Sequence, residues 1–207
     1  MSASEQGTID FTVMYATHNA FRRDLERLRS AAASGRAGEP SVKAGWENFK
    51  TQLLIHHSVE DAELWPRLRR AVEGKPRELA LTDAMEAEHA DLDPLLASVD
   101  AALAGRAGTL ADQVEKLVAT LDDHLTHEED TALPLIQSML TVADWRGFTD
   151  GMRRRQGVKG ASVYVPWVLD GRPDTDRATF LSAMPAPVRV LNRLFWEGGY
   201  RKRQLWG

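Results

Sequence analysis

The sequence contains no cysteine, and this absence excludes several classes of site at once. Without thiols the 207-residue chain has no disulfide framework, thiolate zinc site, iron–sulfur cluster or cysteine nucleophile. Long apolar runs are missing as well, because no stretch approaches the roughly 18 residues that a membrane-spanning helix needs. The N-terminus lacks the basic start and apolar run of a secretory signal. We therefore expect a cytosolic protein without a membrane partner.

Acidic residues are few in the last third of the chain, and basic residues are outnumbered in the rest. Residues 142–207 hold 12 Lys and Arg against 6 Asp and Glu, whereas the first 141 residues hold 14 against 24. A basic tail on an acidic body predicts that the tail lies on the body or meets an acidic protein partner. Because the basic residues are spread along the tail, with Arg153, Arg154 and Arg155 as a tight run, no nucleic-acid partner is expected.

Four segments of the first two-thirds repeat apolar residues at spacings of three and four, which is typical of one helical face. These segments start near Phe11, Val42, Met85 and Leu110, and the first three end at glycine or proline. Connections of roughly three to eight residues favour antiparallel neighbours. The sequence therefore predicts an all-α, up-down-up-down four-helix bundle over residues 8–140. Pro94 should kink the third helix or remove one backbone hydrogen bond.

Residues 141–207 form a basic extension that contains four of the six tryptophans. Such an aromatic content is unusual in a disordered segment, so we expect the extension to pack on the bundle. Within it, the pattern predicts a helix over 144–155, an extended run over 162–168 and a last helix that begins near Pro187.

Histidine is concentrated in the predicted bundle, since all six histidines lie between residues 18 and 127. His18, His56, His89 and His124 each fall on the apolar face of a different predicted helix. Burying an imidazole without a partner costs several kcal/mol. Four such residues, one in each helix, indicate that they share a partner.

Two of these histidines precede a glutamate by four residues, and residues four apart lie on one helical face. Imidazole and carboxylate donors without thiolates suit iron or manganese, with zinc less specific. One ion would be saturated by six such donors, whereas two ions would keep open positions for a small molecule. The two segments align with an offset of 68, matching His56, Glu60 and Pro66 with His124, Glu128 and Pro134.

This order of residues resembles the hemerythrin-like, or HHE cation-binding, family over about residues 8–140. The resemblance implies a non-haem di-iron centre in which Glu60 and Glu128 are candidate bridges. Manganese and zinc are the less favoured metals. The implied metal ligands are His18, His56, Glu60, His89, His124 and Glu128.

One position departs from the oxygen carriers of that family, which place a second histidine where this chain has Asp93. Asp93 would either add negative charge, which favours ferric iron, or leave an open position that peroxide can enter. Both alternatives predict that the ferrous protein oxidises in air instead of binding oxygen reversibly. His57 is expected to flank the site or to face solvent, so that His57→Ala keeps the metal. Glu86, His127 and Tyr15 are further candidates for the site.

The leading interpretation is a cytosolic di-iron protein that binds or reacts with dioxygen, peroxide or nitric oxide. It would act as an oxidoreductase on peroxide or nitric oxide, in a redox or oxidative-stress response. The alternatives are a sensor that signals through the basic extension, and an oxygen- or iron-binding protein without turnover. The sequence leaves these three classes open.

Overall fold

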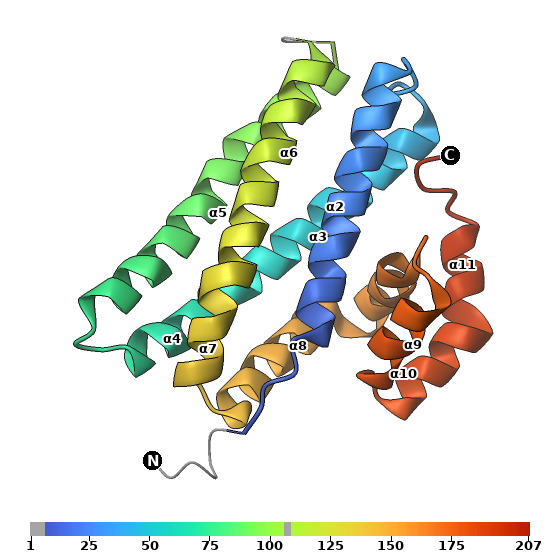
Figure 1. Ribbon diagram of the computed structural model, residues 1–207. Coiled ribbons are helices and arrows are strands. Elements are labelled where there is room, and N and C mark those ends of the chain that lie inside the picture. The colour runs from blue at the N-terminus through green and yellow to red at the C-terminus, as the bar shows by residue number, and fades with distance from the viewer. Residues whose placement is uncertain (1–6, 106–108) are drawn as a thin grey trace. The chain divides into compact units, whose positions relative to one another are not determined.

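The computed structural model describes residues 7–105 and 109–207, and in these ranges the regular structure is entirely helical (Figure 1). The prediction of an all-α chain with long helices packed as a bundle is confirmed. No helix in the described ranges is long and apolar enough to cross a membrane. The elements are α2 (Thr12–Ala33), α3 (Pro40–Val59), η1 (Glu60–Leu64), α4 (Trp65–Ala71), α5 (Pro76–Leu103), α6 (Leu110–His127), η2 (Glu128–Ala132), α7 (Leu133–Met139), α8 (Val142–Leu169), α9 (Asp174–Ser182), α10 (Ala186–Leu191), η3 (Asn192–Trp196) and α11 (Glu197–Arg201).

The chain forms two compact units, each built from separate stretches of sequence. The first unit contains Leu54–Arg155 together with the N-terminal residues up to Asp10. The second contains Phe11–Leu53 and Gln156–Gly207. Helices α3 and α8 each continue from one unit into the other.

The core of the first unit lies between α5 and α6, and α4 and α7 pack against the same core. Helix α5 continues through Pro94, which lacks a backbone N–H and so removes one hydrogen bond without ending the helix. Full burial of a large apolar side chain stabilises a fold by roughly 1.5–3 kcal/mol, so this core is a major source of stability. Its fully buried side chains include Leu64, Trp65, Leu68, Met85, Val99, Leu117, Leu121, Leu125 and Ile136.

An aromatic cluster and a buried carboxylate hold the second unit together. The Phe21 ring lies 5.8 Å from that of Phe49 and 5.2 Å from that of Trp167. Trp167 Nε1 donates a 2.8 Å hydrogen bond to the carboxylate of Asp24, which is fully buried and ion-paired with Arg23 at 2.8 Å. Because Trp167 belongs to the C-terminal extension and the other residues to α2 and α3, the predicted packing of the extension on the long helices is confirmed.

The extended run expected over residues 162–168 is wrong, because α8 passes through this segment as a helix. Gly157, with φ of 58° and ψ of −178°, kinks the helix at one residue, and the helical conformation then resumes. The helix buries Val165, Trp167 and Val168. Packing of these apolar side chains overrides the local β-propensity of a Val- and Tyr-rich segment. The last helical stretch, formed by α10, η3 and α11 in succession, begins at Ala186, next to Pro187 as expected.

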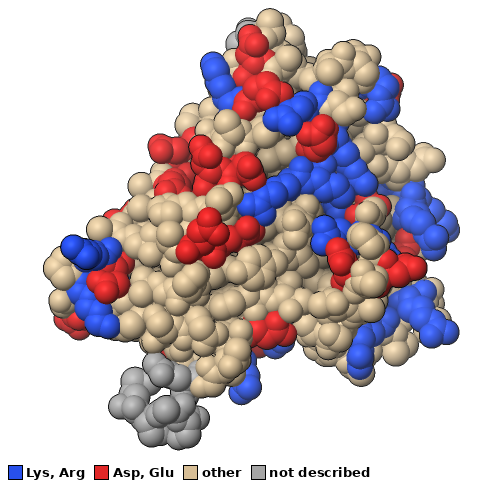
Figure 2. Space-filling model, viewed as in Figure 1, with Lys and Arg blue, Asp and Glu red and all other residues tan. Residues whose placement is uncertain are grey.

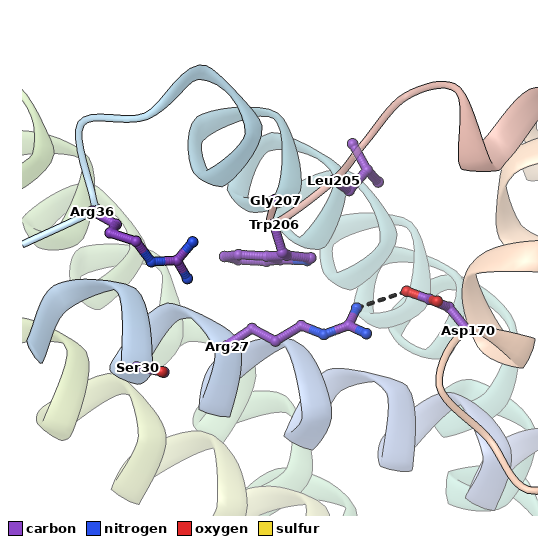
Figure 3. Close-up of a pocket in the computed structure, with 7 residues that line it drawn as sticks. All are labelled: Arg27, Ser30, Arg36, Asp170, Leu205, Trp206 and Gly207. Atoms are coloured by element: carbon purple, nitrogen blue, oxygen red, sulfur yellow. Dashed lines mark hydrogen bonds and ion pairs between the residues drawn. The ribbon is translucent and has the colours of Figure 1, made fainter. Parts of the chain in front are cut away.

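The end of the described chain is anchored on α3 by Trp206. Its backbone N–H donates a 2.9 Å hydrogen bond to the Ser41 carbonyl, and its ring covers Gly45. Figure 3 shows the indole between Arg36 and Arg27, and the latter is held by Asp170 at 2.7 Å. A Cβ on Gly45 would lie 2.4 Å from the indole ring, so only glycine allows this approach.

We predict that Gly45→Ala lowers the free energy of unfolding, although alanine normally stabilises a helix by about 1 kcal/mol relative to glycine. The added methyl group would push Trp206 off α3. Thermal unfolding followed by tryptophan fluorescence measures the effect. Gly199→Ala is the matched control, because this glycine of α11 has no neighbouring atom within 4 Å of an added Cβ. Equal stabilisation by the two substitutions would show that Trp206 is not anchored on Gly45.

Candidate metal centre

Every fourth residue is buried along the helices that carry the pairs His56–Glu60 and His124–Glu128. On a regular α-helix, with 3.6 residues per turn, such a stripe would rotate by about 40° at each step. The π-helical turns η1 and η2, which begin at Glu60 and Glu128, contain more residues per turn and keep the stripe on one side. The two stripes are His56, Glu60, Leu64, Leu68 and Val72, and His124, Glu128, Ala132, Ile136 and Leu140.

Each π turn is closed by a hydrogen bond to the carbonyl of its own glutamate. The Trp65 N–H donates to the Glu60 carbonyl, and the Leu133 N–H donates to the Glu128 carbonyl. A proline follows directly in both segments, at positions 66 and 134. Proline lacks an N–H and its ring clashes with the carbonyl four residues earlier, so the wider turn relieves this conflict. Each of these prolines is therefore preceded by a π turn, after which the helix continues.

One group of candidate ligands combines a histidine with both glutamates. His56, Glu60 and Glu128 each offer a ligand atom within 4.8 Å of the others. Both glutamates are fully buried, and His56 is 2% exposed. His56 Nε2 lies 3.1 Å from Glu60 Oε1.

A second group consists of three imidazoles, those of His57, His89 and His124, whose ligand atoms also lie within 4.8 Å of one another. The rings of His57 and His89 stack at 3.9 Å, and those of His89 and His124 lie 4.7 Å apart. The structure thereby rules out a solvated His57 and makes it a further candidate ligand. His57 is buried beside His56, because α3 is enclosed over an arc wide enough to cover two consecutive residues.

Glu60 connects the two groups. Its Oε1 faces His56, whereas its Oε2 lies 3.7 Å from His89 Nε2 in the group of three imidazoles. The two oxygens of this carboxylate therefore lie near histidines of different groups.

Two further carboxylates fix the orientation of the imidazoles. Asp61 Oδ1 lies 2.7 Å from His89 Nδ1, and Glu88 Oε2 lies 2.8 Å from His124 Nδ1. An imidazole that donates from Nδ1 to a carboxylate presents the Nε2 lone pair to a metal, and such partners are typical of metal sites. Sequence reasoning missed both residues. Each lies directly next to a predicted ligand, Glu60 or His89, and this adjacency was the signal in the sequence.

Burial sets the protonation of the site. It raises the pKa of Glu60 well above the ordinary value, and the charges of Glu128 and Asp61 raise it further. Burial also lowers the pKa of His124, which favours the neutral ring that can bind a metal. Among the described atoms, Nε2 of His89 and Nε2 of His124 are buried without a hydrogen-bond partner. A bound cation would satisfy these nitrogens and the glutamate charges together.

Four other candidates lie outside both groups. Asp93 is exposed, so it does not face the buried donors, and Tyr15 is 41% exposed. The Glu86 carboxylate pairs with Arg69 at 2.9 Å. His127 is partly exposed, and its Nδ1 lies 2.8 Å from Glu88.

His18 is fully buried on α2 in the second unit. The adjacent Thr17 hydroxyl lies 2.6 Å from that of Tyr164. The assignment of His18 as a metal ligand stays a prediction.

We predict that His57→Ala removes most of the bound metal, contrary to the expectation from sequence, because it deletes one of three clustered imidazoles. Loss of a residue that supports a ligand lowers metal affinity by about 10- to 100-fold. Loss of a ligand itself should lower it further. Elemental analysis of the purified variants measures the metal content. His127→Ala serves as the control, since this imidazole lies in neither group. Full metal retention in His57→Ala would return His57 to a flanking role.

We also predict a pH-dependent stabilisation of the metal-free protein by Glu60→Gln. The folded protein keeps the Glu60 proton at pH values where the unfolded chain has lost it, so the free energy of unfolding falls as pH rises above the unfolded pKa of about 4.5. The lowered pKa of His124 has the opposite effect below pH 6.5, and both proteins share it. Glu60→Gln should therefore be the more stable protein at pH 8, by a margin that shrinks toward pH 4.5. Denaturant unfolding at several pH values tests this, and a margin independent of pH would contradict it.

Comparison with known proteins agrees with the site. No curated protein and no solved structure gives a significant match to the chain. The model of the hemerythrin HHE cation-binding domain matches residues 9–136, which include both groups of candidate ligands. Because the match covers more than half of the sequence, the chain belongs to the hemerythrin HHE cation-binding domain family.

Proposed function

We propose that this chain holds two non-haem iron ions and uses them to bind and reduce dioxygen or peroxide. The placement of Glu60, with one oxygen toward each group of donors, is the observation that carries this proposal. His56, Glu60 and Glu128 would hold one ion, with His18 as a further ligand. His57, His89 and His124 would hold the other.

The chemistry of the donors favours iron. Neutral imidazoles and carboxylates, without a thiolate in the sequence, suit iron and manganese, and they also bind zinc less selectively. Zinc has no redox chemistry, so it could not supply electrons to dioxygen or peroxide at this site. When bound, a pair of iron ions supplies electrons to dioxygen or peroxide.

The residues of the chain would orient and protect this chemistry. Asp61 and Glu88 hold the rings of His89 and His124, with both Nε2 atoms turned away from the supporting carboxylates. The next buried positions along the two stripes, Leu64 and Ala132, are apolar and exclude water from the same side of each helix. An environment of this kind strengthens electrostatic interactions and limits side reactions.

Reversible binding of oxygen is the second candidate, and His57 favours it. The sequence argument against a carrier depended on the imidazole that is missing at Asp93. Asp93 is exposed, and His57 contributes a third imidazole to the group of His89 and His124 from a different helix. The donor set therefore no longer argues against reversible binding of oxygen or nitric oxide. A sensor that signals through the C-terminal extension would use the same binding step.

We predict two iron ions per chain in protein produced with iron. Iron at about 100 times its dissociation constant should raise the free energy of unfolding by about 2.7 kcal/mol. Elemental analysis and thermal unfolding with and without iron test both statements. Glu60→Gln, which removes the proposed bridge, should leave at most one iron. A reproducible value near one in the unmodified protein would overturn the dinuclear site.

Optical spectra separate the two candidate functions. Many catalytic cycles for each iron pair with added peroxide and an electron donor would support reduction. A spectrum that forms in air and disappears when oxygen is removed, without consumption of the donor, would support reversible binding.

A further inference from the structure

An apolar face is exposed along α10 and η3 in the second unit. Val190 is 53% exposed, Leu191 37%, Leu194 60% and Phe195 64%. Positions three and four residues apart are neighbours on a helix surface, so Val190 and Leu194, Leu191 and Leu194, and Leu191 and Phe195 adjoin in pairs and the four side chains form one face. Adjoining large apolar side chains on a surface usually mark an interaction site. We call Val190, Leu191, Leu194 and Phe195 the apolar face.

Cations border the apolar face. Arg189 and Arg193 each directly precede a member of it, and Arg201, Lys202 and Arg203 follow at the end of α11. All five are exposed, and in residues 7–105 and 109–207 none of them makes an ion pair. Figure 2 shows Lys and Arg side chains on the part of the surface that the C-terminal helices form.

Other arginines of the same unit are paired, which distinguishes them from these five. Arg177 lies 2.8 Å from Glu197, and Arg172 lies 2.6 Å from Asp176. Glu197 is the only carboxylate side chain in residues 186–207, and it also accepts a 2.8 Å hydrogen bond from Asn192. The cations that border the apolar face are therefore not neutralised by their own segment.

We propose that the apolar face binds the surface of an anionic lipid bilayer. Lipid phosphates would meet Arg189 and Arg193, while Leu194 and Phe195 would enter the region just below the headgroups. Binding of this kind depends on both buried apolar area and attraction to anionic lipids. This proposal replaces the expectation that the chain has no membrane partner, because binding at a surface needs no spanning helix.

Charge argues against a second copy of the chain on this face. In a symmetric dimer the same patch lies on both partners. Two copies of the apolar face would therefore bring the two sets of unpaired arginines together, and like charges repel. An anionic surface instead attracts the arginines and accepts the apolar side chains. The face also lies outside the family match at residues 9–136, so it does not depend on the metal centre.

The test is sedimentation of the full chain with phosphatidylcholine vesicles, with and without phosphatidylglycerol. We expect binding to the phosphatidylglycerol vesicles alone, weakened by salt. Leu194→Ser combined with Phe195→Ser should lower the affinity by at least about tenfold. Arg189→Gln combined with Arg193→Gln should lower it by about thirtyfold.

The matched controls carry the same kinds of substitution outside the apolar face. Val158→Ser removes an apolar side chain that is 77% exposed outside the apolar face. Arg153→Gln combined with Arg154→Gln removes two charges that already have partners, Asp150 and Glu63. Both controls should bind like the unmodified chain, and unchanged circular dichroism and iron content would show that all variants fold.

Three results would overturn the proposal. The first is no binding to phosphatidylglycerol vesicles. The second is equal loss of binding in the controls, which would indicate attraction by net charge only. The third is a dimer without vesicles that Leu194→Ser and Phe195→Ser abolish, measured by analytical ultracentrifugation, which would assign the apolar face to a second copy.

Discussion

Carboxylates buried in an apolar core impose the main constraint on this chain. Glu60 and Glu128 are fully buried, and an isolated charge in such a place is so unfavourable that the group either takes up a proton or meets a cation. The raised pKa of Glu60 is the first of these responses. The imidazoles of His89 and His124, whose buried Nε2 atoms have no hydrogen-bond partner among the described atoms, are arranged for the second. A bound metal would offset the free energy needed to bury these groups, so the buried His and Glu side chains fit a metal-binding site.

Helical periodicity was enough to predict the pairs His56–Glu60 and His124–Glu128, since residues four apart share a face on almost any helix. His57 was beyond the reach of that argument. Consecutive residues differ by about 100° around a helix, and only packing shows how wide an arc is covered. Asp61 and Glu88 were missed for a related reason. Their contacts depend on the rotation of neighbouring helices, which no single segment encodes.

The extension shows how tertiary packing overrides local preference. Residues 162–168 have the composition of a strand, yet they lie in α8 because Trp167 completes the aromatic cluster of the second unit and binds the buried Asp24. The basic residues of the same extension have two different roles. Arg172 and Arg177 hold its own helices together, whereas the arginines that border the apolar face are directed to solvent.

The π turns at Glu60 and Glu128 have a consequence for how this chain tolerates change in length. Residues four apart on an α-helix rotate by about 40° at each step, because the helix has 3.6 residues per turn. A π turn contains one additional residue and reverses this rotation, so the buried residues stay on one side. Deletion of one residue after the glutamate of either turn would leave every ligand of the two groups in the sequence. It would convert the π turn into a regular α turn, so that later residues such as Leu68 and Ile136 would stay on the side of the helix that faces the core. A deletion in a regular turn, which has no additional residue to lose, would instead rotate all later residues by about 100°. These two segments therefore tolerate the loss of one residue better than the regular turns on either side of them.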